Sequence, residues 1–263
     1  MTRPYARYAE IYDRTGQDRF GAAMVGLTLK RLEHARAPIE MALDLACGTG
    51  SAAIELCRRG VNVTGIELEP AMLGMARTNA ARVGFDIAWR LGDMRSFKTR
   101  SKVDLVTCFF DSANYLAGED ELGACFASVA AALKPGGWFA FDLNTIKRFA
   151  DDWNDSTFVA YDDSDLFCVV RSMYDPQSRR SPLFLTTFQR DSISGNRWTR
   201  WDEEHIEYGY PLSLVEAMLG QSGFDVVECL SIDDTSMTIT GPGTEASGRV
   251  LYIVSLGSTE GET

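Results

Sequence analysis

Short apolar runs alternate with helical stretches along residues 41–144, and this alternation limits the fold more than any other feature of the sequence. The runs are MALDLA (41–46), VNVTGIE (61–67), FDIAWR (85–90), VDLVTCFF (103–110) and WFAFDLN (138–144). Nearly continuous apolar strands that alternate with helices are typical of a parallel sheet covered on both faces. The pattern therefore predicts a doubly wound α/β core.

Residues 146–204 break this rhythm, because β-prone runs and turn signals replace the helical stretches there. The segment predicts a small antiparallel sheet inserted after the fifth strand. It contains Trp153, Trp198 and Trp201 together with several phenylalanines. We expect these rings to form the core of the insertion, with a wall that faces a ligand as the alternative.

The remaining segments set the predicted boundaries. Residues 225–230 and 249–256 predict two final strands, so that the core comprises 41–145 and 205–257, the insertion 146–204, and a frayed tail 258–263. Near the N-terminus, Tyr5, Tyr8 and Tyr12 are spaced by three and four residues, which predicts that they share one face of a helix.

Charge and cysteine content narrow the partners and the compartment. The net charge is −11, which disfavours DNA and, without removing it from consideration, tRNA. The six cysteines form no C-x-x-C pair and only two histidines are present, so we expect reduced thiols and no metal site. No apolar run is long enough for a membrane helix or a signal peptide, and a cytoplasmic protein is expected.

The strongest local signal is LDLACGTGSAA (43–53), a strand that runs into a glycine turn and then a helix. In doubly wound sheets, ligands bind at the carboxyl ends of the strands near such a turn. Gly48, Gly50 and Ala53 also satisfy the loose G-x-G-x-x-A form of the dinucleotide fingerprint. The turn alone therefore leaves nicotinamide cofactors and other cofactors open.

Acidic residues follow several of the predicted strands. Asp44, Glu67, Asp93 and Asp111 are all expected at the same edge of the sheet. An acidic residue after the second strand suits the two hydroxyls of a ribose, whichever cofactor is bound. The combined negative charge would repel a pyrophosphate, and it favours a cationic cofactor without phosphates.

Five motifs together give a specific resemblance. LDLACGTG, GIELEPAML, LGDM, DLVTCFFDSANYL and LKPGGWFAFD occur in order, and as a set they resemble the motifs of class I S-adenosylmethionine-dependent methyltransferases. The resemblance implies a Rossmann-like sheet of seven strands, mostly parallel with a closing antiparallel hairpin. It also implies S-adenosylmethionine as cofactor and S-adenosylhomocysteine as product.

The resemblance assigns cofactor contacts to residues of this chain. Gly48 and Gly50 would lie beside the methionine part, Asp44 would orient its amine, and Glu67 would hold the ribose. Leu68 and Met72 would flank the adenine, whose edge would meet Asp93 and Met94. The expected cofactor site is completed by Ala46, Gly92 and Phe109.

A second, looser resemblance is to bacterial small-molecule enzymes that include amino-sugar N,N-dimethyltransferases and glycine N-methyltransferase-like proteins. It rests on YARYAEIYD, FFDSANYL, the insertion, and EEHIEYGYPLSLVEAMLGQSGF. It implies that residues 1–40 form a helical lid, from which Tyr5 and Tyr12 reach the cofactor or substrate, with a packing role as the alternative. The N-P-P-Y signature of enzymes that methylate nucleic-acid amino groups is absent, since Asp111–Tyr115 reads DSANY.

Four side chains are candidates for the chemistry. We expect Asp111 to bind or deprotonate an acceptor amine, or alternatively to cap the next helix. Asn114 is expected to bind substrate and Tyr115 to line the acceptor pocket, or both to complete a turn. His205 is a candidate general base, with a structural hydrogen bond as the alternative.

The predicted function is methyl transfer to a small-molecule acceptor, with an amine nitrogen favoured, by in-line displacement. Within the methyltransferases, an oxygen acceptor or a tRNA nucleoside remains an alternative. Two alternatives belong to other functional classes, namely a nicotinamide-dependent oxidoreductase and a non-catalytic cofactor-binding protein. The sequence is compatible with a monomer or a homodimer.

Overall fold

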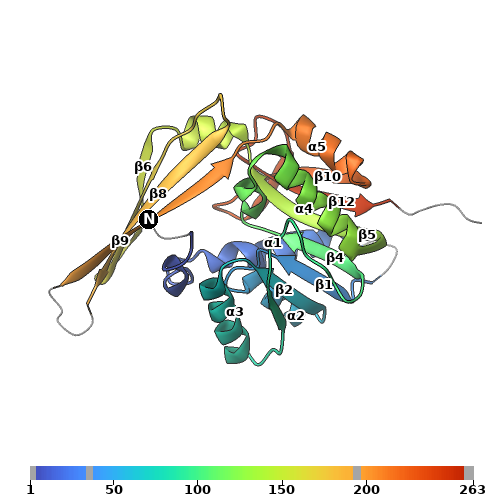
Figure 1. Cartoon of the computed structure of the whole chain (residues 1–263), viewed down its shortest axis with the longest axis horizontal. Helices are drawn as coiled ribbons and strands as arrows, with labels where there is room; N and C mark the ends of the chain where they lie inside the picture. Colours follow the sequence, from blue (N-terminus) through green and yellow to red (C-terminus); the bar gives the residue numbers. More distant parts are fainter. Residues whose placement is uncertain (1–3, 34–37, 192–196, 258–263) are drawn as a thin grey trace, which may run out of the picture.

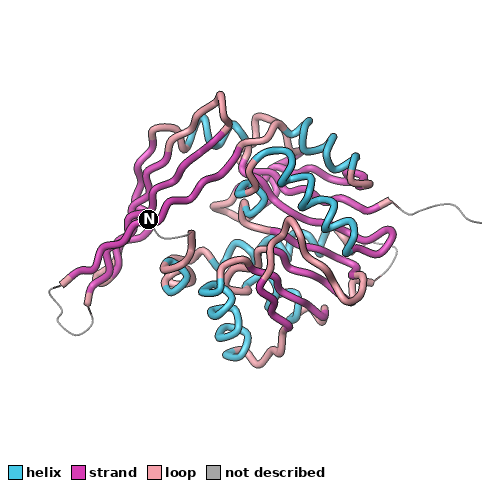
Figure 2. The backbone as a smooth tube through the Cα atoms, in the orientation of Figure 1, coloured by secondary structure: helices cyan, strands magenta, loops and turns pink. Residues whose placement is uncertain are grey.

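The structure, a computed structural model, describes residues 4–33, 38–191 and 197–257. Within these residues the strands form one sheet of eight and one sheet of four. Helices cover the larger sheet, whereas the smaller sheet extends away from it to one side (Figure 1, Figure 2). The predicted tail, 258–263, lies outside the described residues.

The central sheet has the strand order β11-β10-β12-β5-β4-β1-β2-β3. Its parallel part consists of β1 (Met41–Leu45), β2 (Asn62–Glu67), β3 (Ala88–Leu91), β4 (Val103–Cys108) and β5 (Leu133–Asn144). The order reverses at β1, which lies between β2 and β4, so the carboxyl ends of these strands border a crevice. The predicted doubly wound architecture is confirmed.

Three antiparallel strands complete this sheet, one more than predicted. β12 (Arg249–Leu256) pairs with β5, β10 (Phe224–Asp233) pairs with β12, and β11 (Thr238–Pro242) pairs with β10. The sequence did not indicate β11, because TITGP is short and contains a glycine and a proline. An edge strand tolerates both residues, since one side of its backbone needs no partner in the sheet.

Helices cover both faces of the central sheet (Figure 1). α1 (Asp18–Arg31), α2 (Ser51–Arg58) and α3 (Pro70–Arg82) pack on one face, and α4 (Gly118–Ala132) and α5 (Leu212–Gln221) pack on the other. Leu105 and Val106 of β4 belong to opposite cores, because side chains alternate across a strand. No helix in the described residues has the length and apolar character needed to cross a membrane.

The insertion after β5 is confirmed as an antiparallel sheet. A short π-helical turn, η3 (Arg148–Asp152), leads into β6 (Ser156–Asp162), β7 (Leu166–Ser172), β8 (Arg180–Arg190) and β9 (Trp198–Tyr208). β9 continues past residue 204, where the insertion was expected to end. His205 therefore lies on the inserted sheet, not in the core.

The N-terminal segment differs from its prediction. Residues 4–17 form turns and one 3₁₀ turn, η1 (Tyr8–Glu10), so the expected shared helical face is wrong. The tyrosines still meet, because Tyr12 lies with its ring centroid 6.0 Å from those of Tyr5 and Tyr8. The physical reason is packing, since Tyr8 and Ile11 are buried against residues of the inserted sheet.

The glycine turn after β1 generates a stability prediction. Gly50 has a φ of +87°, and a Cβ there would meet Cη2 of Trp89 at 2.7 Å. Gly60 has nearly the same φ, +84°, but a Cβ there would meet nothing within 4 Å. We expect Gly60→Ala to cost ~1–2 kcal/mol of unfolding free energy for the left-handed conformation alone.

Gly50→Ala should cost a further ~1–3 kcal/mol, because the added methyl group overpacks the site. Urea unfolding of the two variants beside the wild type measures the difference. Equal losses in the two variants would contradict the prediction, since they would mean that the Trp89 ring moves aside without cost.

Candidate active site

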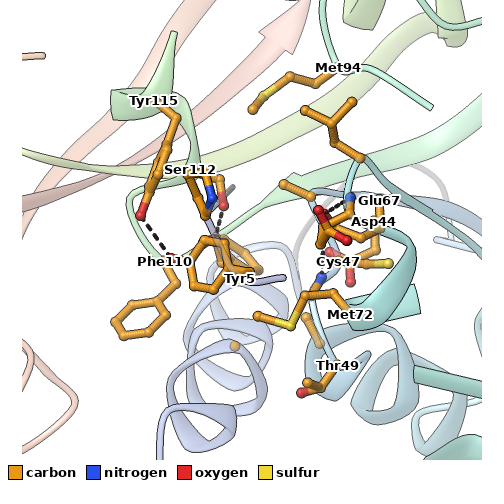
Figure 3. A pocket seen from close by; sticks show the side chains of 18 of the residues that line it. Tyr5, Asp44, Cys47, Thr49, Glu67, Met72, Met94, Phe110, Ser112 and Tyr115 are labelled. Carbon is orange, nitrogen blue, oxygen red and sulfur yellow. Dashed lines mark hydrogen bonds between the residues drawn. The ribbon is translucent and has the colours of Figure 1, made fainter. Parts of the chain in front are cut away.

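The larger of two adjoining cavities occupies about 460 Å³ and borders the ends of β1, β2 and β4 (Figure 3). Figure 3 shows Asp44, Cys47 and Glu67 on one side of it and Tyr5, Ser112 and Tyr115 on the other. Most of the predicted cofactor residues line it, namely Tyr5, Tyr12, Asp44, Ala46, Gly48, Glu67, Leu68, Met72, Asp93, Met94 and Phe109.

Two predicted cofactor residues, Gly50 and Gly92, do not belong to the lining. Gly50 is the N-cap of α2, and its N–H donates to the carbonyl of Cys47 (2.8 Å). The N–H of Gly92 donates to the carbonyl of Glu67 (2.9 Å). Both glycines therefore shape the backbone behind the cavity wall.

Glu67, the last residue of β2, accepts hydrogen bonds from two backbone segments that border the cavity. Its Oε2 accepts the N–H of Gly48 (2.9 Å) and its Oε1 accepts the N–H of Glu69 (2.8 Å), so the glycine turn and the start of α3 share one carboxylate. Burial raises the pKa of Glu67 above its usual value. Each oxygen keeps a lone pair that could accept a hydroxyl of a ligand.

Asp44 presents an unsatisfied acceptor to the cavity. Its Oδ1 accepts the hydroxyl of Thr107 (2.7 Å), whereas Oδ2 is buried without a hydrogen-bond partner. Burial raises the pKa of this carboxyl, which is 1% exposed, to about 7. A buried acceptor without a partner requires an explanation, and a cationic N–H donor of a bound ligand would supply the missing hydrogen bond.

Asp93 lies in the cavity wall, but its carboxylate already has a strong partner. The Nε of Arg95 is 3.0 Å from both Asp93 oxygens, and this guanidinium holds the pKa of Asp93 below its usual value. Arg95 also pairs with Glu121 of α4. The expected contact of Asp93 with an adenine therefore competes with an ion pair that sequence reasoning missed.

Apolar side chains form the rest of this end of the cavity. Leu68 is 64% exposed, which is unusual for a large aliphatic side chain, whereas Met72 is buried. Met72 and Met94 lie on opposite sides of the cavity in Figure 3. An apolar slot of this kind suits a flat ring that covers the exposed leucine.

A smaller cavity of about 170 Å³ adjoins the first, and the two share Tyr5, Tyr12, Gln17, Phe110 and Tyr115 in their linings. The predicted catalytic residues Asp111 and His205 line this second cavity, and Tyr115 lines both. The structure therefore brings the three predicted catalytic residues together beside the larger cavity.

A chain of polar contacts runs along the boundary between the cavities. The hydroxyls of Tyr5 and Tyr115 share a hydrogen bond (2.9 Å), and the Tyr115 hydroxyl shares another with Nδ1 of His205 (2.9 Å). Nε2 of His205 lies 3.5 Å from Oε2 of Glu203. This arrangement connects the wall of the larger cavity to the inserted sheet.

Glu203 also anchors the N-terminal segment. Its carboxylate accepts the backbone N–H groups of Tyr5 (2.8 Å), Arg7 (2.8 Å) and Tyr8 (3.1 Å). Sequence reasoning missed this residue, although its position two residues before His205 on a predicted β segment signals that both side chains share one face.

The backbone around Asp111 is strained and is held by a neighbouring strand. Phe110 and Asp111 have φ values of 65° and 51°, in the left-handed region that non-glycine residues rarely adopt. Their N–H groups donate to the two carboxylate oxygens of Asp142 on β5 (2.6 and 3.0 Å). The alternative role of Asp111, a side-chain cap, is not observed, since Asp111 forms no side-chain cap bond at the helical turn η2 (Ser112–Tyr115).

Arg249, at the start of β12, compensates the acidic residues of this region. Its guanidinium lies 3.2 Å from Asp111 and also pairs with Asp142, both in the buried interior. The rings of Phe20 and Phe110 lie against it, at 4.7 and 5.5 Å from their centroids. Neither Asp142 nor Arg249 was predicted, although a charge inside an apolar strand segment is a signal of a buried pair.

Asn114 has a different place from the expected substrate contact. It belongs to neither cavity lining, and its Nδ2 donates to the carbonyls of Asn144 (3.0 Å) and Tyr208 (2.9 Å). Its Oδ1 accepts the N–H of Asn144 (2.9 Å). Because its amide is engaged on both sides by backbone groups, Asn114 braces η2 against β5 and β9.

No group of three His, Cys, Asp or Glu side chains suited to a metal ion occurs in the part of the chain that the structure describes.

The contacts of Glu203 predict how firmly the N-terminal segment is held. In Glu203→Ala, three backbone N–H groups lose a charged acceptor, and each such bond contributes ~1.5–3 kcal/mol. Trypsin should then cleave after Arg7 and Arg14 at least ~10-fold faster than in the wild type, as followed by mass spectrometry. Glu204→Ala removes the same charge from the opposite face of β9 and serves as the matched control. Equal cleavage rates in the two variants would contradict the assignment.

Comparison of the sequence and the structure with known proteins identifies the family of this chain. A family model described as "Methyltransferase domain" matches residues 42–137. YqeM of Bacillus subtilis, a protein assigned to the methyltransferases, is 32% identical over 185 residues, which are 70% of this chain and 73% of that protein. An S-adenosylmethionine-dependent methyltransferase of known structure from Clostridium acetobutylicum is 26% identical, with a TM-score of 0.83 over 97% of this chain and 99% of that one.

A further relative is the dTDP-3-amino-3,4,6-trideoxy-alpha-D-glucopyranose N,N-dimethyltransferase of Streptomyces venezuelae, which is 32% identical over 151 residues, or 55% of this chain and 60% of that enzyme. These matches agree with the cavity at the carboxyl edge of the sheet, with its glycine turn and acidic strand ends. The chain belongs to the class I S-adenosylmethionine-dependent methyltransferases, and S-adenosylmethionine is its cofactor.

Proposed function

We propose that this enzyme methylates an amine nitrogen of a small molecule. The observation that carries the proposal is the second cavity, which adjoins the cofactor cavity and is lined by the carboxyl groups of Asp111 and Glu207. A carboxyl-lined cavity attracts a basic nitrogen more strongly than a neutral hydroxyl. Similarity to a sugar N,N-dimethyltransferase supports the same acceptor atom.

The larger cavity suits S-adenosylmethionine part by part. The unpartnered Oδ2 of Asp44 would accept from the ammonium group of the methionine part, beside Ala46 and Gly48. Glu67 would accept the ribose hydroxyls, and the adenine would cover Leu68 beside Met72 and Met94. Tyr5, Tyr12 and Phe109 would complete the walls. When bound, the cofactor supplies an electrophilic methyl group on a sulfonium.

The residues of the chain would then orient the acceptor and exclude water, which are the main requirements of an in-line displacement. Asp111 would attract the acceptor nitrogen. Tyr115, between the cavities, would position it and pass a proton to His205, whose ring Glu203 orients from behind. Tyr5 and the N-terminal segment would cover the reacting groups, since Glu203 holds this segment over them.

An acceptor panel tests the proposal. We expect S-adenosylhomocysteine to form with cyclohexylmethylamine or with D-glucosamine, and not with cyclohexylmethanol or glucose. His205→Gln and Tyr115→Phe should each lower kcat by ~10²-fold or more, the usual contribution of proton transfer by a positioned side chain. Glu204→Gln serves as the control. Turnover of the alcohols in preference to the amines would overturn the proposed acceptor.

The pKa of Asp44 predicts how cofactor binding depends on pH. This pKa is about 7 in the free protein, and an ammonium ligand binds to the ionised form, so affinity should fall as pH falls through 7. For S-adenosylhomocysteine we expect about tenfold weaker binding at pH 6 than at pH 8, measured by isothermal titration calorimetry.

Asp44→Asn keeps an acceptor for the Thr107 hydroxyl but has no charge to lose, and it should abolish this pH dependence. Asp86→Asn, at an exposed residue outside the cavity lining, should retain it. An unchanged slope in Asp44→Asn would show that another group controls binding.

A further inference from the structure

The second cavity has two chemically different ends, because the apolar lining residues of the inserted sheet lie on β6, β7 and β8, whereas its acidic lining residue lies on the edge strand β9. At one end lie Asp111 and Glu207, with His205 and Tyr115 beside them. The other end is apolar and is contributed by the region of the inserted sheet, through Trp153, Phe158, Ala160, Val170, Leu183 and Leu185. The acidic end concerns only the nitrogen of the acceptor, whereas the apolar end concerns the part of the acceptor that is not methylated.

At the acidic end, Asp111 and Glu207 line the same cavity, and both residues are buried. Burial and the nearby charge of Asp111 raise the pKa of Glu207 well above its usual value, so Glu207 binds a proton more readily than an exposed carboxylate does. Asn144 fixes the geometry, since its Nδ2 donates to Oε2 of Glu207 (3.1 Å).

The neighbouring charges leave this end negative. Arg249 is the cation in the lining, and its guanidinium is already engaged by three carboxylates, those of Asp111, Asp142 and Asp234. The other titratable groups that face the cavity are His205 and the hydroxyls of Tyr5, Tyr8, Tyr12 and Tyr115. An additional cation is therefore attracted to the pair in spite of the arginine.

At the apolar end, Phe158 of β6 is 41% exposed although it lines the cavity. Large apolar side chains left open at a concave site are typical of a surface that a ligand covers. The next residue, Val159, is 54% exposed and is not part of the lining. Phe158 and Val159 are thus adjacent, exposed apolar residues, of which only Phe158 lines the cavity.

We propose that the acceptor is an amphipathic amine, whose ammonium head is held by Asp111 and Glu207 and whose body is an apolar ring or branched alkyl group packed on the inserted sheet. The proposal rests on the proposed N-methylation and specifies its substrate class. An acceptor body covered with hydroxyl groups would not fit this site as well, because the lining residues from the inserted sheet are apolar.

The proton balance involves Glu207 and His205. When an ammonium binds, Glu207 releases its proton to solvent, so that two carboxylates face one cation. The ammonium next passes a proton through Tyr115 to His205, and the freed nitrogen lone pair attacks the methyl carbon. The N–C bond forms as the C–S bond breaks, and the electron pair of that bond remains on sulfur. The methylated amine leaves as a cation. After the product leaves, His205 returns its proton to solvent and Glu207 takes one up again, with one proton released in total.

Binding to the enzyme saturated with S-adenosylhomocysteine tests the substrate class without turnover. Cyclohexylmethylamine should bind at least tenfold more tightly than D-glucosamine or than cyclohexylmethanol. Phe158→Ala should weaken cyclohexylmethylamine binding about tenfold, the scale of a partly exposed aromatic contact, and leave D-glucosamine unchanged. Val159→Ala, the matched control outside the cavity, should change neither affinity.

Calorimetry in buffers of different ionisation enthalpy tests the carboxyl pair. At pH 7.5 the wild type should release about one proton on binding cyclohexylmethylamine. Glu207→Gln keeps an acceptor for Asn144, and it should release none and bind the amine at least tenfold more weakly. Glu204→Gln, on the opposite face of β9, should behave as the wild type. Thermal unfolding confirms that each variant is folded, and the proton count of the wild type does not depend on any variant.

The outcomes separate the two proposals. If no amine of either kind yields S-adenosylhomocysteine, the proposed function fails. If D-glucosamine is methylated and binds as tightly as cyclohexylmethylamine, without proton release, N-methylation stands and the amphipathic acceptor is overturned.

Discussion

The arrangement of the site depends on the buried carboxylate of Asp142. From β5 it accepts the N–H groups of Phe110 and Asp111 and pairs with Arg249 of β12. Left-handed backbone at two successive non-glycine residues costs ~1–2 kcal/mol each, and this carboxylate offsets that cost with charged hydrogen bonds. The sharp path of the chain then carries Asp111 and Tyr115 to the boundary between the two cavities.

Three side chains of β9, those of Glu203, His205 and Glu207, face the same side of the inserted sheet, because residues two apart in a strand share a face. Glu203 accepts backbone N–H groups of the N-terminal segment, His205 shares a hydrogen bond with Tyr115, and Glu207 lines the second cavity together with Asp111. The inserted sheet therefore contributes to both ends of the second cavity, with Glu207 and His205 at the acidic end and Phe158 at the apolar end. No residue that the structure describes in the inserted sheet belongs to the lining of the larger cavity, so substitutions within this sheet would alter the second cavity without changing that lining.

Sequence reasoning located most of the lining of the cofactor cavity and missed the partners of those residues. Asp44 and Glu67 follow strands that were visible as apolar runs, and they line the cavity. Arg95 was missed because an exposed arginine two residues after Asp93 resembles any surface charge. Asn114 was misplaced because spacing along the chain does not show that its amide meets Asn144 and Tyr208, which are 30 and 94 residues away. Trp201 is buried in the core of the inserted sheet, as predicted for its aromatic residues, whereas Trp153 and Phe158 line a cavity, which was the alternative.

The sequence by itself determined the doubly wound sheet and the insertion, because these depend on contiguous strand, turn and helix signals within residues 41–204. The resemblance of five motifs within residues 41–144 to a known family indicated the cofactor. Only the tertiary structure decided the second cavity. Its walls combine side chains from distant segments, among them Tyr5, Asp111, Phe158, Glu207 and Arg249. No local period or motif encodes which of these meet, since their proximity follows from how the inserted sheet and the N-terminal segment pack against the core.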